Sequence, residues 1–314
     1  MSVTVLVPSY NHAPFIERTL RSIFAQTLPP KKLIVIDDGS KDESVRIIGK
    51  ILGDCPFDFE FIKRENRGLC ATLNEGLKRT ETPYFAYISS DDVWLPEFLE
   101  SRISLLENRP NTVLSYGYAH LIDEEDHIID SNQNWGEYTD GNALSMLLIP
   151  RIPASAAVVY RTNILEKCHW TDGIALEDFD LYLRLSVLGE FALDDKILSA
   201  WRIHYYNTSK DSPLMMNEWL AAIERNAEVI GLDKESLEQV LQKIKFRYVA
   251  DFTRYGDKKE AWKMFRENLS GAESIAEIGK NLARLVIPRK LFLWNRERKA
   301  QKAKETNEKL ELKD

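Results

Sequence analysis

Cysteine is scarce in this sequence, which has Cys55, Cys70 and Cys168 among its 314 residues. An odd number of cysteines without CxxC spacing does not predict a disulfide framework, and it suits a reducing compartment. Long hydrophobic runs are also missing, because stretches such as 143–149 are far too short to span a bilayer. The first apolar segment follows Met1 almost directly, so no signal peptide is predicted and we expect a cytoplasmic protein.

Positive charge is not in excess either, since the formal net charge is −7 at pH 7. This balance argues against a general nucleic-acid-binding protein. Paired histidines at ligand spacing, such as HxxxH, are absent as well. The histidines outside position 204 are His12, His120, His127 and His169.

Residues 84–96 are the most informative segment of the chain. An apolar stretch, 84–88, ends in Ser89, Ser90, Asp91 and Asp92. Paired carboxylates at the end of a buried strand are costly unless their charge is compensated. Hard divalent cations such as Mg²⁺ and Mn²⁺ bind carboxylate oxygens and leave positions open for a diphosphate. The segment therefore indicates either a metal site or a surface turn rich in aspartate.

Strand and helix signals alternate over the first ~120 residues, in the manner of a βαβ succession. Buried strands are predicted at 3–7, 33–36 and 84–88, with amphipathic helices between them. Ser40 and Glu43 have the spacing of a capping box for the second helix. Polar clusters follow the strands at 8–11, 37–40 and 89–92. In a parallel sheet these carboxyl ends share one edge, where ligands bind, so we expect the clusters to converge.

The pattern changes after about residue 113. A hairpin is predicted from 113–122 and 128–129, and further strands at 157–160 and 197–203. Beyond residue 213 the chain is predicted to be helical to its end. We therefore predict two domains, 1–212 and 213–314.

Three acids in four positions, Glu177, Asp178 and Asp180, begin a predicted helix. Asp178 suits either an N-cap or a general base whose pKa is raised by burial or by a neighbouring acid. His204 ends a predicted strand, where it is either structural or a ligand. The segment 66–68, Asn-Arg-Gly, precedes a helix and is either an ordinary junction or an approach for an anion.

Taken together, these motifs resemble the family 2 glycosyltransferases of the GT-A fold. The resemblance covers about residues 3–212, and its specificity lies in the order and spacing of the motifs. The matching signatures are Val-Pro-Ser-Tyr-Asn at 7–11, Ile-Asp-Asp-Gly-Ser at 36–40, Asn-Arg-Gly at 66–68, Ser-Ser-Asp-Asp at 89–92 and Glu-Asp-Phe-Asp-Leu at 177–181. Two positions depart from the pattern of many relatives: Ser89 replaces an acid of the metal region, and Leu73 replaces an arginine.

The resemblance implies an α/β GT-A sheet, Rossmann-like and mostly parallel with flanking helices, followed by a helical C-terminal region. It also implies an inverting transfer from a nucleotide-diphosphate sugar, with Mn²⁺ or Mg²⁺ as cofactor. Asp178 would be the catalytic base, and Asp92 and His204 would hold the metal. The implied donor-binding residues are Pro8, Ser9, Tyr10, Asp37, Asp38, Asn66, Gly68 and Asp91.

The expected function is therefore transfer of a sugar to a glycan or polyprenyl-linked saccharide in bacterial surface polysaccharide synthesis, and the resemblance implies a UDP-sugar as donor. Two alternatives stay open: a nucleotidyltransferase, and a non-catalytic protein that binds nucleotide-sugars or acts as a scaffold. The segment 280–304 carries nine basic residues and one acid, Glu297, interleaved with apolar residues. This composition favours either an amphipathic helix on the inner face of an anionic membrane or a helix that packs on protein.

Overall fold

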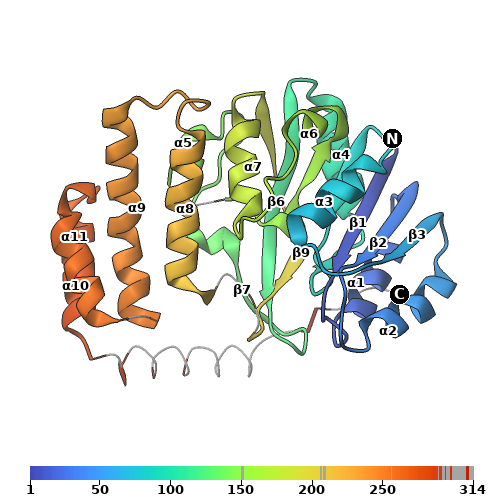
Figure 1. The fold of residues 1–314 in the computed structure, drawn as a ribbon, viewed down its shortest axis with the longest axis horizontal. Coiled ribbons are helices and arrows are strands. Elements are labelled where there is room, and N and C mark those ends of the chain that lie inside the picture. Colours follow the sequence, from blue (N-terminus) through green and yellow to red (C-terminus); the bar gives the residue numbers. More distant parts are fainter. Residues whose placement is uncertain are drawn as a thin grey trace.

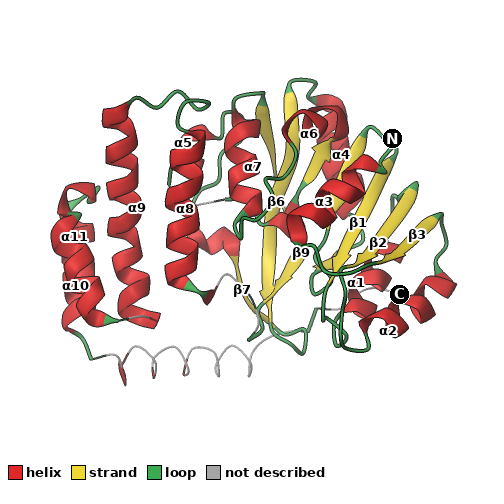
Figure 2. Cartoon of the chain, viewed as in Figure 1, coloured by secondary structure: helices red, strands yellow, loops and turns green. Residues whose placement is uncertain are grey.

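The structure is a computed structural model that describes residues 1–149, 152–205, 207, 210–255, 257–288, 290–291, 294, 298 and 309–310. Its centre is a mixed sheet whose strands pair in the order β3-β2-β1-β4-β8-β6-β9-β5, with β7 beside β6. Helices cover both faces of this sheet, and a row of helices stands beside it (Figure 1; Figure 2). The predicted α/β architecture with a helical C-terminal region is confirmed.

The N-terminal half of the sheet is parallel, and its inner strands β1, β2 and β4 are buried on both faces. Val5 and Val7 pack on the side of α1, whereas Leu6 between them packs on the side of α3. Such continuous apolar strands are typical of parallel sheets that have helices on both faces. The strands of this half are β1 (Val3–Ser9), β2 (Lys32–Asp37), β3 (Phe59–Lys63) and β4 (Tyr84–Tyr87). Its helices are α1 (Ile16–Phe24), α2 (Ser44–Ile51), α3 (Leu69–Lys78) and α4 (Phe98–Asn108).

The carboxyl ends of β1, β2 and β4 lie at one edge of the sheet, as predicted. Ser9 at the end of β1 is in register with Asp37 at the end of β2. The next residue, Asp38, donates its N–H to the carbonyl oxygen of Ser9 at 2.8 Å. On the other side of β1, Ile88 donates to the carbonyl oxygen of Leu6 at 3.0 Å. The three polar clusters that follow these strands therefore converge.

The predicted hairpin is confirmed by β6 (Thr112–Ile122) and β7 (Ile128–Ser131), which pair antiparallel. Strand β8 (Val159–Arg161) pairs antiparallel with both β4 and β6, and so joins the two halves of the sheet. Strand β9 (Glu190–Arg202) runs parallel to β6 and begins well before the predicted strand. Its middle carries the exposed residues Asp195 and Lys196, so no continuous apolar run marks its start.

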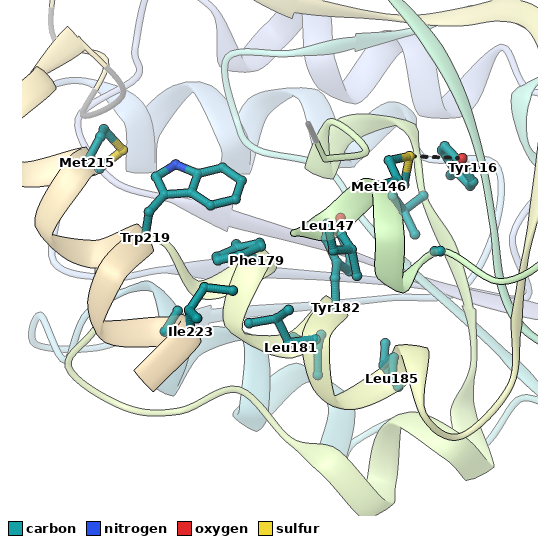
Figure 3. Close-up of a cluster of buried hydrophobic side chains, with 14 of the residues drawn as sticks. Tyr116, Met146, Leu147, Phe179, Leu181, Tyr182, Leu185, Met215, Trp219 and Ile223 are labelled. Atoms are coloured by element: carbon teal, nitrogen blue, oxygen red, sulfur yellow. Dashed lines mark hydrogen bonds between the residues drawn. The ribbon is translucent and has the colours of Figure 1, made fainter. Parts of the chain in front are cut away.

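The C-terminal helices pack against the sheet domain through α7 (Glu177–Ser186) and α8 (Ser212–Asn226). The rings of Phe179 and Trp219 meet with their centroids 3.7 Å apart (Figure 3). One cluster of buried apolar side chains includes Tyr116 of β6 and Ile244 of α9. The division at residue 212 stays a prediction, although α8 begins there. The remaining helices are α9 (Lys234–Tyr255), α10 (Lys258–Glu267), α11 (Ile275–Val286), α5 (Leu144–Leu147) and α6 (Thr162–Cys168).

Short 3₁₀ helices and one short strand complete the described elements. They are η1 (Leu52–Asp54), η2 (Asn132–Trp135), η3 (Ser155–Ala157), η5 (Leu269–Gly271) and β5 (Val93–Trp94). Strand β5 directly follows Asp92 and pairs antiparallel with β9. It thereby ties the loop that carries Asp91 and Asp92 to the far side of the sheet.

The capping box predicted at Ser40 is wrong. Helix α2 begins at Ser44, and Ser40 instead donates its hydroxyl to Asp37 at 2.7 Å. The same hydroxyl accepts the N–H of Asn11 at 2.9 Å. Asp178 is likewise not an N-cap, because it lies in the first turn of α7, after Leu176 at the cap position. The Ser40 side chain therefore belongs to the turn after β2, and the Asp178 side chain lines a cavity.

Leu310, near the C-terminus, packs against the sheet domain. Its side chain is buried with Val93 of β5 and Ala200 of β9. Its N–H donates to the carbonyl oxygen of Asp126 at 2.9 Å, and Arg18 of α1 donates to its carbonyl oxygen at 2.5 Å. Leu310 therefore lies near the strand β5 that follows the Asp91–Asp92 loop.

Candidate functional site

The loop after β2 is built on two buried carboxylates. Asp37 accepts hydrogen bonds from the hydroxyls of Ser9 at 3.1 Å and Ser40 at 2.7 Å. Asp38 accepts the N–H groups of Arg67 at 3.0 Å and Gly68 at 2.8 Å, which joins this loop to the start of α3. Arg64 Nη1 lies 3.0 Å from Asp38 Oδ1 and compensates its charge. The two acids therefore fix the edge of the sheet.

Glycine is required at the centre of this turn. Gly39 has a φ of +83°, and a Cβ there would lie 2.9 Å from the backbone nitrogen of Asn66. Around this turn the structure brings the predicted donor residues together at one sheet edge. Tyr10, 46% exposed, and Asn66 are open to solvent there. Pro8, Ser9, Asp37, Asp38 and Gly68 form the more enclosed part of the same edge.

Asp91 lies between two histidines. Its Oδ2 is 2.8 Å from Nε2 of His204, and its Oδ1 is 3.7 Å from Nδ1 of His12. The ligand atoms of the three residues lie within 4.8 Å of one another. Oδ1 of Asp91 is buried and has no hydrogen-bond partner in the described part of the chain. An unpartnered buried carboxylate oxygen beside two imidazoles fits a divalent cation, and the nitrogen ligands suit Mn²⁺ better than Mg²⁺.

His12 was not singled out by the sequence analysis. It follows the first strand by three residues, and Nδ1 of its ring lies 2.8 Å from the hydroxyl of Ser90. Burial lowers the pKa of His12, against the raising effect of the Asp91 charge. A neutral imidazole is the form that binds metals. The signal that could have found it is its position, because it continues the polar cluster 8–11 at the sheet edge.

Asp92 has a different environment from Asp91. Its Oδ1 accepts the backbone N–H of Arg202 at 2.9 Å, and the residue is 2% exposed. Burial, followed by the charge of Asp91, raises the pKa of Asp92 well above its ordinary value. The role of Asp92 as a ligand stays a prediction, and the geometry favours Asp91 for that role.

Arg202 holds the loop of Asp91 and Asp92 through hydrogen bonds. The side chain is 1% exposed, and its Nε donates to the carbonyl oxygen of Asp91 at 2.8 Å. Its Nη2 donates to Asp126 at 2.6 Å, and Arg18 of α1 also pairs with Asp126 at 3.2 Å. The sequence analysis missed Arg202, because nothing in the local pattern of β9 links it to a loop more than a hundred residues away.

Glu177 and Asp178 form an acidic pair at the N-terminus of α7. Burial, then the charge of Asp178, raises the pKa of Glu177 to about 8. Burial also raises the pKa of Asp178 to about 6, even though its Oδ1 accepts the N–H of Phe179 at 2.7 Å. At pH 7 the pair therefore holds a proton on Glu177 and a negative charge on Asp178. Such a pair provides a base beside an acid.

A cavity of about 870 Å³ connects these groups. Asp91 and Asp92 line one part of it, and Glu177 and Asp178 another. Ser89 lines the cavity as well. The family resemblance implies an acid at this position in many relatives. Among the described lining residues, Asp91 is the one member of the predicted donor-binding set. The cavity is also lined by Trp135, Trp201, Met215, Trp219, Arg247, Tyr248 and Asp251.

Comparison with known sequences connects this site to others. The family model described as Glycosyl transferase family 2 matches residues 4–168. An uncharacterized glycosyltransferase of Nostoc sp. is 24% identical over 242 residues, which are 73% of each chain. The chondroitin synthase of Escherichia coli is 25% identical over 233 residues, 74% of this chain and 33% of its own length.

Comparison with solved structures shows the same fold. TarS of S. aureus, residues 1–349 in complex with UDP-GlcNAc, aligns with a TM-score of 0.57 at 15% identity. The alignment covers 86% of this chain and 90% of the TarS 1–349 chain. A mannosyltransferase of Pyrobaculum calidifontis, in complex with GDP-Man and Mn²⁺, aligns with a TM-score of 0.59 at 16% identity, covering 93% and 87%. The sheet that positions the cavity is therefore shared with these proteins.

Proposed function

Because the chain belongs to glycosyl transferase family 2, we propose that it is an inverting glycosyltransferase that moves a sugar from a nucleotide-diphosphate donor to an acceptor hydroxyl. One observation carries this proposal: Asp91, flanked by two histidines, and Asp178 line the same cavity. The structural neighbours support a nucleotide-sugar as donor, since TarS is bound to UDP-GlcNAc and the mannosyltransferase to GDP-Man. We propose a UDP-sugar for this chain.

Different residues at the sheet edge would bind different parts of the donor. The edge around Asp38, Asn66 and Gly68 would bind the nucleotide, with Tyr10 beside the base. Asp91 and His204, with His12 next to them, would hold Mn²⁺ or Mg²⁺. When bound, such an ion neutralises the charge that develops on the leaving diphosphate.

Asp178 would act as the base. Its carboxylate takes the proton of the acceptor hydroxyl while that oxygen forms a bond to the anomeric carbon. The bond from the anomeric carbon to the diphosphate oxygen breaks, and its electron pair leaves with the diphosphate. A single displacement of this kind inverts the anomeric configuration and requires no nucleophile from the protein. The raised pKa of Asp178, about 6, suits a base that works near neutral pH.

The two alternatives have different requirements. A nucleotidyltransferase is expected to have a loop rich in glycine and basic residues after the first strand, whereas residues 8–11 are Pro-Ser-Tyr-Asn. A non-catalytic binding or scaffold protein would bind the nucleotide-sugar without using Asp178. Ser89 is the feature that supports this second alternative, because it removes an acid from the metal region.

A donor screen tests the proposed function. The purified protein is incubated with Mn²⁺ or Mg²⁺ and a panel of UDP-, GDP- and dTDP-sugars, and thermal shift and nucleotide release are recorded. We expect one donor to give stabilisation and slow nucleotide release, both lost when EDTA replaces the metal. Stabilisation without release by any donor would favour the scaffold alternative, and no stabilisation at all would contradict a nucleotide-sugar site.

We further propose a glycan or polyprenyl-linked saccharide as acceptor, at the inner face of a bacterial membrane. Within the described residues, no helix is both long and apolar enough to cross a bilayer. Helix α11, however, presents Ile275, Leu282 and Val286 to solvent, with exposed fractions of 88%, 42% and 69%. Lys280 and Arg284 lie on the same helix. Much of the predicted segment 280–304 beyond residue 288 lies outside the described residues.

Exposed apolar side chains beside basic ones bind anionic membranes. We therefore expect the protein to float with vesicles rich in phosphatidylglycerol and not with neutral phosphatidylcholine vesicles. The double variant Leu282→Glu, Val286→Glu should lose this binding. Val229→Glu, which changes another exposed apolar residue (53% exposed), should keep it. Unchanged flotation of the double variant would reject α11 as the membrane contact.

A further inference from the structure

Helix α8 holds the segment that leads into the acidic pair. Oε2 of Glu218 accepts the backbone N–H of Ala175 at 3.0 Å and that of Leu176 at 3.4 Å. These two residues directly precede Glu177, and both line the cavity. The backbone that enters α7 is therefore fixed by a carboxylate from α8, which lies outside the family match at 4–168.

A second anchor lies just after the pair. Asp180 is fully buried and accepts hydrogen bonds from Asn226 Nδ2 at 2.9 Å and Arg225 Nη1 at 2.5 Å, both on α8. Thr171 and Arg184 donate to its other oxygen at 2.7 Å and 2.9 Å. Burial alone would raise the pKa of Asp180, but these partners lower it. The acidic pair is thus held between two contacts from α8.

The neighbouring residue of α8 packs on the same turn. Trp219 lies on the ring of Phe179, the residue that follows Asp178, and Figure 3 shows both rings between α7 and α8. Glu218 therefore contacts the backbone just before α7, and Trp219 and Asn226 contact residues of its first turn. A shift of α8 relative to α7 would move the acidic pair in the cavity.

We propose that Glu218 is a positioning residue for the proposed transfer reaction: its carboxylate holds the backbone before Glu177 and Asp178 and places a negative charge beside this pair. This inference rests on the proposed function, because it assigns Asp178 the role of the base. The charge of Glu218 supports this inference, because Glu218 is among the groups that raise the pKa of Glu177. The other titratable groups that interact with Glu177 are Asp178, Tyr87 of β4, Tyr160 of β8 and Cys70 of α3.

Two variants separate the charge of Glu218 from its hydrogen bonds. Glu218→Gln keeps an oxygen that accepts from the backbone but removes the charge. We expect the pKa of Glu177 to fall in this variant, measured by titrating the carboxyl ¹³C resonance of labelled glutamate, with Glu177→Gln for assignment. Glu224→Gln, an exposed position on the same helix, should leave this resonance unchanged. An unchanged Glu177 titration in Glu218→Gln would overturn the inference.

Glu218→Ala removes the hydrogen bonds as well. We expect nucleotide release from UDP-GlcNAc or GDP-Man, whichever is turned over, to slow by about 10- to 100-fold, as small misplacements of catalytic groups do. The KM for the donor should not change, because the residues proposed to bind the donor do not lie on α7 or α8. A rise in donor KM at unchanged turnover would also contradict a positioning role.

The titration distinguishes a failure of the proposed role of Asp178 from a failure of the proposed role of Glu218. If Asp178→Asn keeps the parent rate while the Glu177 resonance responds to Glu218→Gln, the base assignment fails but the contact is real. If Asp178→Asn loses activity and Glu177 does not respond, only the inference about Glu218 fails. Because the titration needs no substrate, it gives a result even when the variants have no measurable turnover.

Discussion

Replacement of Asp178 with asparagine is expected to lower sugar transfer by about 10²-fold or more, the usual contribution of a general base. Asparagine retains the size of the side chain and its hydrogen bond with the N–H of Phe179, so donor affinity should be preserved. The measurement is the rate of nucleotide release with the donor found in the screen, together with the thermal shift caused by that donor. A parent-like rate would show that Asp178 is not the base.

The pH profile gives the same test without a mutation. Asp178 accepts a proton only in its ionised form, and its pKa is about 6. The rate should therefore rise as the pH increases through about 6 and fall steeply below it. Glu177, with a pKa of about 8, is already neutral at pH 7, so Glu177→Gln should lose far less activity there than Asp178→Asn. Asp172→Asn, in the exposed loop before α7, is the matched control.

The second large effect concerns the metal. Asp91→Asn is expected to weaken Mn²⁺ binding by at least about 10- to 100-fold, because even residues that only support a ligand have effects of this size. His204→Gln should act in the same direction, since the ring of His204 lies 2.8 Å from Asp91. Electron paramagnetic resonance of free Mn²⁺, titrated with protein in the presence of UDP, measures both affinities.

Asp92→Asn is the informative comparison. The asparagine oxygen can accept the N–H of Arg202 as Asp92 Oδ1 does, so the loop should keep its conformation. We therefore expect Mn²⁺ binding close to that of the parent. The reverse result, with affinity lost in Asp92→Asn and kept in Asp91→Asn, would establish Asp92 as the ligand, as the sequence motif predicts.

The sequence was sufficient for the parts of the site that follow strands. The ends of β1, β2 and β4 are marked by abrupt changes from apolar to polar residues, and the topology of parallel strands brings them to one edge. For this reason the meeting of Ser9, Asp37 and Asp91 near that edge could be predicted. A separate signal, three acids at the start of a predicted helix, indicated Asp178, and burial raises the pKa of its carboxyl group there.

The contacts that complete the site could not be predicted, because they join elements far apart in the chain. His204 and Asp91 are separated by 113 positions, and Ala175 and Glu218 by 43. Neither pair has a spacing that reflects a shared helix face or strand face. Ligand spacing within one element does not reveal His12 either, and its place just after the polar cluster 8–11 is the one signal for it in the sequence. The start of β9 was missed because exposed charged residues interrupt its apolar pattern.

The distribution of the seven tryptophans has an optical consequence. Trp135, Trp201 and Trp219 line the cavity, and the first two meet edge to face with centroids 6.2 Å apart. By contrast, Trp94 and Trp170 are enclosed, with exposed fractions of 0% and 2%. A molecule entering the cavity changes the polarity around three indole rings, whereas the enclosed pair contributes a constant background. The unlabelled protein thus has a built-in fluorescent reporter of cavity occupancy.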